Sequence, residues 1–435
     1  MKLIKILLNI LLLPCVFLHA EDKLEVNLLN KKKNNNNKLL EQMLKENQKD
    51  SLSSSSSSYS FQKPEIRLLD LSLILQTAAG ISTAKDSELT QLQTGAHDPR
   101  RRGFTFQNGE ISLSGIVDPY FKSEMYALFS EAGVELEEAF LTTTSLPWKL
   151  ELELGYFYTE FGRNNPRHPH LWDFIDQPLT VGRFFGSEGQ RASGFRLGGS
   201  LPLPWLSEWH VGAQSPTGGL TPSFKTTSSS TVGGRPVVRK ETRSLNDMLL
   251  LIRWLNGGSV SRNWEFQTGL SAMRGANNSG LDSITTLLGA DFVFNWTSSK
   301  QKQGYPFLRI EGESAYRNFE AAAGTHNGLI YATDDLKDWV WSLQSTYGFK
   351  QHWRVGFRYE KASGKGSSFS QLRSQDSTRS DRERSSAVLT YKGSEFSKTS
   401  LQYNFDRADH LTDKNHSSLW LSFEVLIGSH PAHNF

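Results

Sequence analysis

The stretch KLELELGYFY (149–158) decides the fold, because its side chains alternate in character from one residue to the next. The apolar positions on one face of the extended chain are Leu150, Leu152, Leu154, Tyr156 and Tyr158. The other face carries Glu151, Glu153, Gly155 and Phe157. Strict alternation over this length predicts a β-strand with one apolar and one more polar face.

The same period of two continues on both sides of this stretch. About 16 segments from residue 66 onward show it, and the boundaries are good to a few residues. They cover 66–76, 103–117, 119–130, 134–145, 147–159, 192–202, 206–214, 246–257, 263–274, 282–297, 304–320, 337–349, 352–362, 385–393, 396–407 and 416–428. One of them, MLLLIRWL (248–255), fits poorly because it is apolar on both faces.

The connections between these segments alternate in length. Those after even-numbered segments are short, and several after odd-numbered ones are long: 77–102, 160–191, 215–245, 321–336 and 363–384. Outer-membrane barrels combine short periplasmic turns with long extracellular loops. We therefore predict an all-β fold: an antiparallel transmembrane β-barrel over 64–435, with about 16 strands and no plug domain. A large secreted β protein is the alternative, but no blade-length repeat supports it.

Composition narrows the class of protein further. The mean hydropathy of −0.45 excludes a bundle of membrane helices, and 35 glycines with 11% aromatic residues fit a β-rich exported chain. The formal charge is +3, and no basic cluster is interleaved with aromatic residues. We therefore expect no nucleic-acid partner.

The N-terminal 63 residues differ from the rest. Residues 1–20 have two early lysines, an apolar run and Ala20 before Glu21, which predicts a cleavable signal peptide. An uncleaved anchor, or lipidation at Cys15, is the alternative. Removing this segment leaves 46 basic and 45 acidic residues and no cysteine. Residues 21–63 read as a low-complexity periplasmic linker, with 39–50 at helical spacing for a short coiled coil.

Three stretches resemble a known bacterial family. They are GEISLSGIVDPYFKSEMYALF (109–129), VELEEAFLTTTSLPWKLELELGYFYTEFGRNNPRHPHLWDFIDQPL (134–179) and IGSHPAHNF (427–435). Together they resemble the zinc-regulated TonB-dependent outer-membrane receptors, a porin-like family. The resemblance implies a barrel whose expression is linked to zinc. The TonB part fits badly, because such transporters have 22 strands and a plugged lumen.

Two histidine pairs are the candidate metal ligands. His168 and His170 stand in one long connection with Asp173 and Asp176 close behind, and imidazole with carboxylate suits zinc. The alternative is a structured loop in which Trp172 and Phe174 pack inward and Asp176 caps a turn. The second pair, His430 and His433, follows the last segment at the opposite end of the expected barrel. Zinc is the one cofactor that these residues suggest.

Charged side chains of both signs are predicted to face the lumen. They are Glu151, Glu153, Arg196, Glu265, Arg309, Glu311, Glu313, Arg358, Glu360 and Glu424. No nucleophile elbow, Walker loop or dinucleotide motif is present in the sequence, so we expect no enzyme.

Three functions follow as hypotheses. The first is a porin-like outer-membrane barrel for small solutes or metal ions, with a zinc link. The second is a surface-binding or adhesion barrel acting through its long external loops. The third is a TonB-coupled receptor that lacks its own plug. The expected partners are outer-membrane lipid, the barrel-assembly machinery and other copies of the chain.

Overall fold

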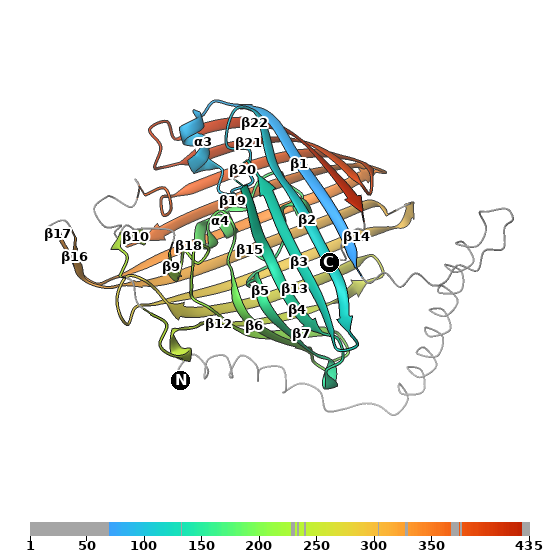
Figure 1. Ribbon diagram of the computed structural model, residues 1–435. Helices are drawn as coiled ribbons and strands as arrows, with labels where there is room; N and C mark the ends of the chain where they lie inside the picture. The colour runs from blue at the N-terminus through green and yellow to red at the C-terminus, as the bar shows by residue number, and fades with distance from the viewer. Residues whose placement is uncertain are drawn as a thin grey trace, which may run out of the picture. The chain divides into compact units, whose positions relative to one another are not determined.

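A computed structural model describes residues 69–428, apart from 132, 228–230, 233–234, 239–240, 303, 327–328, 367–373 and 375. The predicted signal peptide, the linker and the pair His430/His433 lie outside these residues. The described chain forms one closed antiparallel barrel of sixteen strands (Figure 1). In order around the barrel they are β1 (Asp70–Ser82), β2 (Gly103–Asp118), β3 (Phe121–Ser130), β4 (Gly133–Thr143), β5 (Leu150–Tyr158), β6 (Arg191–Ser200), β7 (Leu206–Gln214), β12 (Leu249–Ser261), β13 (Trp264–Ala276), β14 (Ile284–Lys302), β15 (Tyr305–Ala321), β18 (Asp334–Lys350), β19 (Trp353–Lys365), β20 (Arg382–Ser394), β21 (Ser397–Ala408) and β22 (Asn415–Gly428).

The barrel is closed by its first and last strands. β1 pairs with β22 from Ser72 opposite Gly428 to Ser82 opposite Ser418. Each of the sixteen predicted segments overlaps one barrel strand, so the predicted fold class is confirmed. The main difference is β1, which continues six residues beyond its predicted end at Gln76 because Thr77 to Ser82 also pair with β22.

Side chains alternate between the outside and the inside of the barrel, as the sequence period predicts. In β21, the outward Leu401, Tyr403 and Phe405 are exposed, whereas the intervening Gln402 and Asn404 are fully buried. An outer surface of exposed Leu, Phe and Tyr with a polar interior is typical of a barrel in lipid.

The connections have different lengths at the two ends of the barrel. Short turns join β2 to β3, β12 to β13 and β18 to β19, whereas the connections with internal structure lie at the other end. The latter carry α3 (Asp86–Leu92), η2 (Pro169–Leu171), α4 (Leu179–Phe185), η3 (Leu245–Asp247), β8 (Thr217–Gly218), β9 (Lys225–Thr226), β10 (Thr231–Val232), β11 (Arg235–Pro236), β16 (Gly324–His326) and β17 (Leu329–Tyr331), while η1 (Pro147–Lys149) lies in the β4–β5 turn. Among the described residues, no helix combines the length and the apolar character that crossing a membrane requires.

Candidate functional site

The connection between β5 and β6, residues 159–190, folds into the barrel and is called the lumen loop below. Its α4 packs against β15, β18 and β19 (Figure 1). The loop also bonds to other walls: the Gly162 N–H donates to Ser271 Oγ on β13 at 3.1 Å, and the Ile175 N–H donates to Gln402 Oε1 on β21 at 2.7 Å. The length of this connection predicted one of the long extracellular loops of a barrel. That prediction was wrong, because apolar and ionic contacts draw the loop inside.

An apolar core forms between the lumen loop and the barrel wall. Phe161, Phe184 and Phe185 are at most 1% exposed. They share a cluster with lumen-facing apolar side chains, among them Leu249 and Leu251 of β12. This core explains why 248–255 is apolar on both faces: one face contacts the surroundings of the barrel, and the other packs beneath the loop.

Ion pairs fix the first part of the lumen loop to β15. Glu311 lies 3.1 Å from Arg163 Nε and 3.0 Å from Arg167 Nη2. The neighbouring inward side chain, Glu313, accepts backbone N–H bonds from Arg163 and Asn164, both at 2.8 Å. A carboxylate that accepts several charge-assisted or backbone bonds is a strong anchor, because every partner keeps it in one place.

Asp176 fixes the middle of the lumen loop to the opposite wall. Its carboxylate is fully buried and accepts bonds from Arg384 at 2.9 Å, Gln402 at 2.8 Å, Asn404 at 2.7 Å and Arg358. Burial alone would raise the pKa of Asp176, but the two guanidinium groups outweigh it and hold the pKa below its usual range. The carboxylate is therefore ionised, and it ties the loop to three neighbouring strands, β19 to β21.

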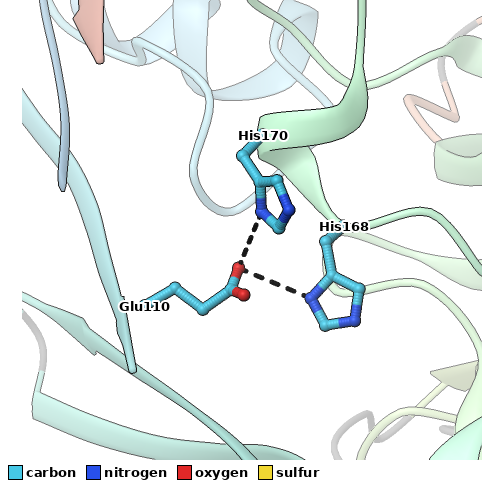
Figure 2. Close-up of side chains that lie close together, drawn as sticks. All are labelled: Glu110, His168 and His170. Atoms are coloured by element: carbon cyan, nitrogen blue, oxygen red, sulfur yellow. Dashed lines mark hydrogen bonds and ion pairs between the residues drawn. The ribbon is translucent and has the colours of Figure 1, made fainter. Parts of the chain in front are cut away.

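His168 and His170 sit where the lumen loop meets β2 and β4 (Figure 2). The Oε2 atom of Glu110 on β2 lies 3.4 Å from His168 Nδ1 and 3.1 Å from His170 Nδ1. On the β4 side, Glu137 Oε2 lies 3.1 Å from His168 Nδ1, and Glu138 Oε2 lies 2.8 Å from His168 Nε2. We call these five residues the histidine–glutamate cluster.

A β-bulge brings two consecutive glutamates of β4 to the lumen. Tyr126 of β3 pairs with Glu138, but the next residue, Ala127, pairs with Leu136, so Glu137 is the extra residue. Both Glu137 and Glu138 are buried inside, whereas regular alternation would send one of them outward. Bulges redirect side chains in this way next to functional sites.

Electrostatics hold His168 in the cluster. Burial alone would lower the pKa of His168, but the carboxylates of Glu137 and Glu110 outweigh it and hold the pKa well above its usual range. His168 also lies between two aromatic rings, with centroids 4.6 Å away for Tyr126 and 5.7 Å away for Tyr158. A buried site with several carboxylates around one imidazole therefore attracts positive charge, whether from protons or from a cation.

The structure separates the four metal ligands predicted in the lumen loop. His168 and His170 meet in the cluster, but Asp173 accepts bonds from Thr346 and Arg354, each at 3.2 Å, and Asp176 accepts bonds from the arginines described above. The predicted ligand set is corrected accordingly, since both aspartates are occupied by cationic and polar partners on other strands. The alternative, a structured loop with inward-packing aromatic residues, is confirmed in part. Phe174 is buried, and Cζ of Arg358 lies 4.5 Å from the centroid of its ring.

Sequence reasoning missed the three glutamates of the cluster. Glu110 lies 58 residues before His168, so no spacing rule connects them. The pair Glu137–Glu138 does carry a signal, because two adjacent acids interrupt the alternation of VELEEAFL (134–141). Such an interruption within a clear strand indicates a bulge.

Below the lumen loop, toward the short turns, the inner faces of the strands carry charges of both signs. Glu151, Glu208 and Glu265 are at least partly exposed on the inner faces of β5, β7 and β13. On β20 and β21, Lys392 and Lys398 are partly exposed on the inner face, opposite each other in register. Water therefore reaches charged side chains in this half of the lumen.

The upper side of the lumen loop is tied to the connection between β1 and β2. The Ala96 N–H donates to the Ser187 carbonyl at 3.0 Å, His97 lies 3.2 Å from Glu188, and the Gln177 N–H donates to Asp98 at 2.8 Å. The two connections thus form one packed layer at this end of the barrel. The lumen is narrowed there.

Solved structures of several outer-membrane channels share this fold. The outer-membrane channel DcaP of Acinetobacter baumannii superposes with a TM-score of 0.54 over 82% of this chain and 97% of its own, at 11% identity. The anion-selective porin of Comamonas acidovorans and OprB of Pseudomonas putida each reach a TM-score of 0.50 over 82% of this chain, at 8% identity. They cover 99% and 94% of their own chains, respectively. At these identities the likeness shows a porin-like barrel fold.

Comparison by sequence adds a relative without a known activity. An uncharacterised protein of Aquifex aeolicus (strain VF5) is 28% identical over 393 residues, which are 85% of this chain and 80% of the relative. No protein-family model matches the chain. The porin-like part of the resemblance is thus supported by the fold. Nothing in these comparisons favours the zinc-regulated TonB-dependent receptors.

Proposed function

We propose that this protein is a channel of the bacterial outer membrane that passes small hydrophilic solutes through a restricted lumen. The observation that carries the proposal is the closed sixteen-stranded barrel, apolar outside and polar inside, with the lumen loop fixed across it. Barrels of this strand number are wide enough for an aqueous channel. A loop folded inside reduces that width and thereby restricts the size of the solute.

The charge distribution supports small charged or dipolar solutes. A solute that enters from the short-turn end meets acids on β5, β7 and β13 and lysines on β20 and β21. Rings or arcs of charge set ion preference in channels. Because both signs are present in this half of the lumen, we expect a weak preference for either ion and passage of molecules that carry both charges.

The other hypotheses make different demands on the structure. An adhesion barrel would act through its long outer connections and would conduct poorly. A TonB-coupled receptor would need a plug from a partner, since the inserted element in the described residues is a connection between two strands of the barrel. Three further predictions are compatible with the fold and stay predictions: metal ions as cargo, zinc-linked expression and assembly into homo-oligomers.

Planar-bilayer recording tests the proposal. The purified protein should give discrete steps of conductance that are smaller than those of a sixteen-stranded barrel with an open lumen. Deleting residues 164–187, with a short glycine linker in their place, should enlarge the steps. A folded barrel that stays silent both with and without this deletion would overturn the channel and favour a function of the outer connections.

A further inference from the structure

We propose that Glu110, Glu137, His168 and His170 bind one divalent transition-metal ion, with Zn²⁺ as the probe, and that the ion clamps the lumen loop to β2 and β4. Metal binding by this site does not depend on the proposed channel. Its consequence for conductance rests on the proposed function. The donor set of two imidazole nitrogens and two carboxylate oxygens suits Zn²⁺ and its neighbours rather than Mg²⁺ or Ca²⁺.

Three of the six separations between the proposed donor atoms match those of a tetrahedral zinc site. Bonds of about 2.0–2.1 Å at tetrahedral angles place neighbouring donors about 3.3 Å apart. In the structure, His168 Nδ1 lies 3.4 Å from Glu110 Oε2 and 3.1 Å from Glu137 Oε2. The third separation, from His170 Nδ1 to Glu110 Oε2, is 3.1 Å. The donor atoms of Glu110, His168 and His170 all lie within 4.8 Å of one another (Figure 2). A zinc ion can therefore enter with small movements of side chains.

Surrounding groups hold these donors in the orientation that a metal needs. Glu138 Oε2 lies 2.8 Å from His168 Nε2, which places the proton there and leaves Nδ1 for the ion. The other oxygen of Glu138 accepts the Tyr158 N–H at 2.8 Å, and Glu137 Oε1 accepts the Tyr158 hydroxyl at 2.7 Å. A carboxylate behind a ligating histidine, itself fixed by hydrogen bonds, is the usual outer shell of a zinc site.

Burial and charge point to a cation as the ligand. Glu110 and Glu137 are each 1% exposed and His168 is 3% exposed. The carboxylates of Glu110, Glu137 and Glu138 therefore converge at a place that water hardly reaches. Within the described part of the chain, Oε1 of Glu110 accepts no hydrogen bond. Buried charges need a partner. A doubly charged metal ion would balance these negative charges with a single atom. Without metal, protonated histidines would balance them as ion-pair partners.

The experiment measures zinc binding by the full chain, folded in detergent, in a His430→Ala/His433→Ala background that removes the tail histidines. Titration calorimetry in a zinc buffer should show one site per barrel, and Co²⁺ should give the visible absorption of a tetrahedral complex. His170→Ala and Glu110→Gln should each weaken Zn²⁺ binding by at least about tenfold. His210→Ala, a lumen-facing histidine on β7, is the matched control and should leave binding unchanged.

Several results would overturn the clamp. A folded barrel without a stoichiometric zinc site would show that the histidines serve as ion-pair partners only. Binding that survives Glu110→Gln, or that His210→Ala weakens equally, would place the metal elsewhere. Conductance is recorded separately, with and without zinc. Silence in the bilayer with intact zinc binding would count against the channel, and loss of binding in a conducting barrel would count against the metal site.

Discussion

Asp176→Asn should release the lumen loop. The substitution keeps the size of the side chain but removes the negative charge from a position that is fully buried and accepts bonds from four side chains. It leaves the guanidinium groups of Arg358 and Arg384 buried with less compensation. Each keeps one carboxylate, because Glu360 lies 3.1 Å from Arg358 and Asp406 lies 2.7 Å from Arg384.

The magnitude follows from the burial of this site. Removing one partner of a buried ion pair costs about 3–5 kcal/mol, and the two remaining carboxylates favour the lower end of that range. A cost of about 3 kcal/mol raises the population of the released loop roughly 100-fold. The barrel wall itself keeps its strand pairing, so the protein should still fold.

Two assays read the released loop. Trypsin cleaves after arginine, and Arg163, Arg167 and Arg183 are protected while the loop is packed. When opening is fast compared with cleavage, the cleavage rate tracks the open population, so it should rise by about two orders of magnitude. Single-channel records should show larger or noisier steps than the unsubstituted protein.

Asp173→Asn is the matched control in the same loop. The side chain of Asp173 is 13% exposed, and its contacts to Thr346 and Arg354 are both 3.2 Å long. Partly solvated pairs contribute at most about 1 kcal/mol, so cleavage should rise by no more than about fivefold. If Asp176→Asn folds yet shows the cleavage and conductance of the unsubstituted protein, the lumen loop is not held by this carboxylate and the reasoning fails.

Three further predictions concern charge, backbone and lipid contact. Glu265→Gln should shift the reversal potential in a KCl gradient toward anions and Lys392→Gln toward cations; equal shifts in one direction would contradict the arrangement of charges. Gly162→Ala should loosen the loop, since φ is +64° and the added Cβ would lie 2.7 Å from Oε1 of Glu313; tryptic protection equal to the unsubstituted protein would refute this. Leu401→Arg puts a charge on the lipid face and should cost about 2–4 kcal/mol of folding free energy in vesicles, whereas Leu401→Phe should be tolerated; equal urea midpoints would show that β21 does not face lipid.

The barrel could be predicted because its signal is local. A strand such as 149–158 shows its apolar and its polar face in its own sequence. The alternation of short and long connections then indicates a closed membrane barrel. The position of the lumen loop could not be predicted in this way. Its anchors, Glu311 and Arg384, lie more than 140 residues further along the chain. The one local sign of the inserted loop was the strand 248–255, which is apolar on both faces. Its inner face packs against α4.

The sequence predicted the histidines of the candidate site but not its glutamates. His168 and His170 attract notice as ligand types at short spacing, and the structure brings them together. The aspartates that follow were assigned to the same site by proximity in sequence, but arginines on β19 and β20 bind them. The pairing of distant strands brings Glu110 to the histidines, and a bulge in β4 turns both Glu137 and Glu138 inward. No spacing rule contains either effect.

The lumen loop also constrains how the chain assembles. Its apolar core and its ion pairs require β12 through β21, which are made long after the loop itself, while the seam between β1 and β22 joins the two ends of the barrel. Native contacts of the loop on several walls therefore form only after those later strands are in place. The loop is made early but is fixed late, so the packing of the lumen depends on completion of the wall around it.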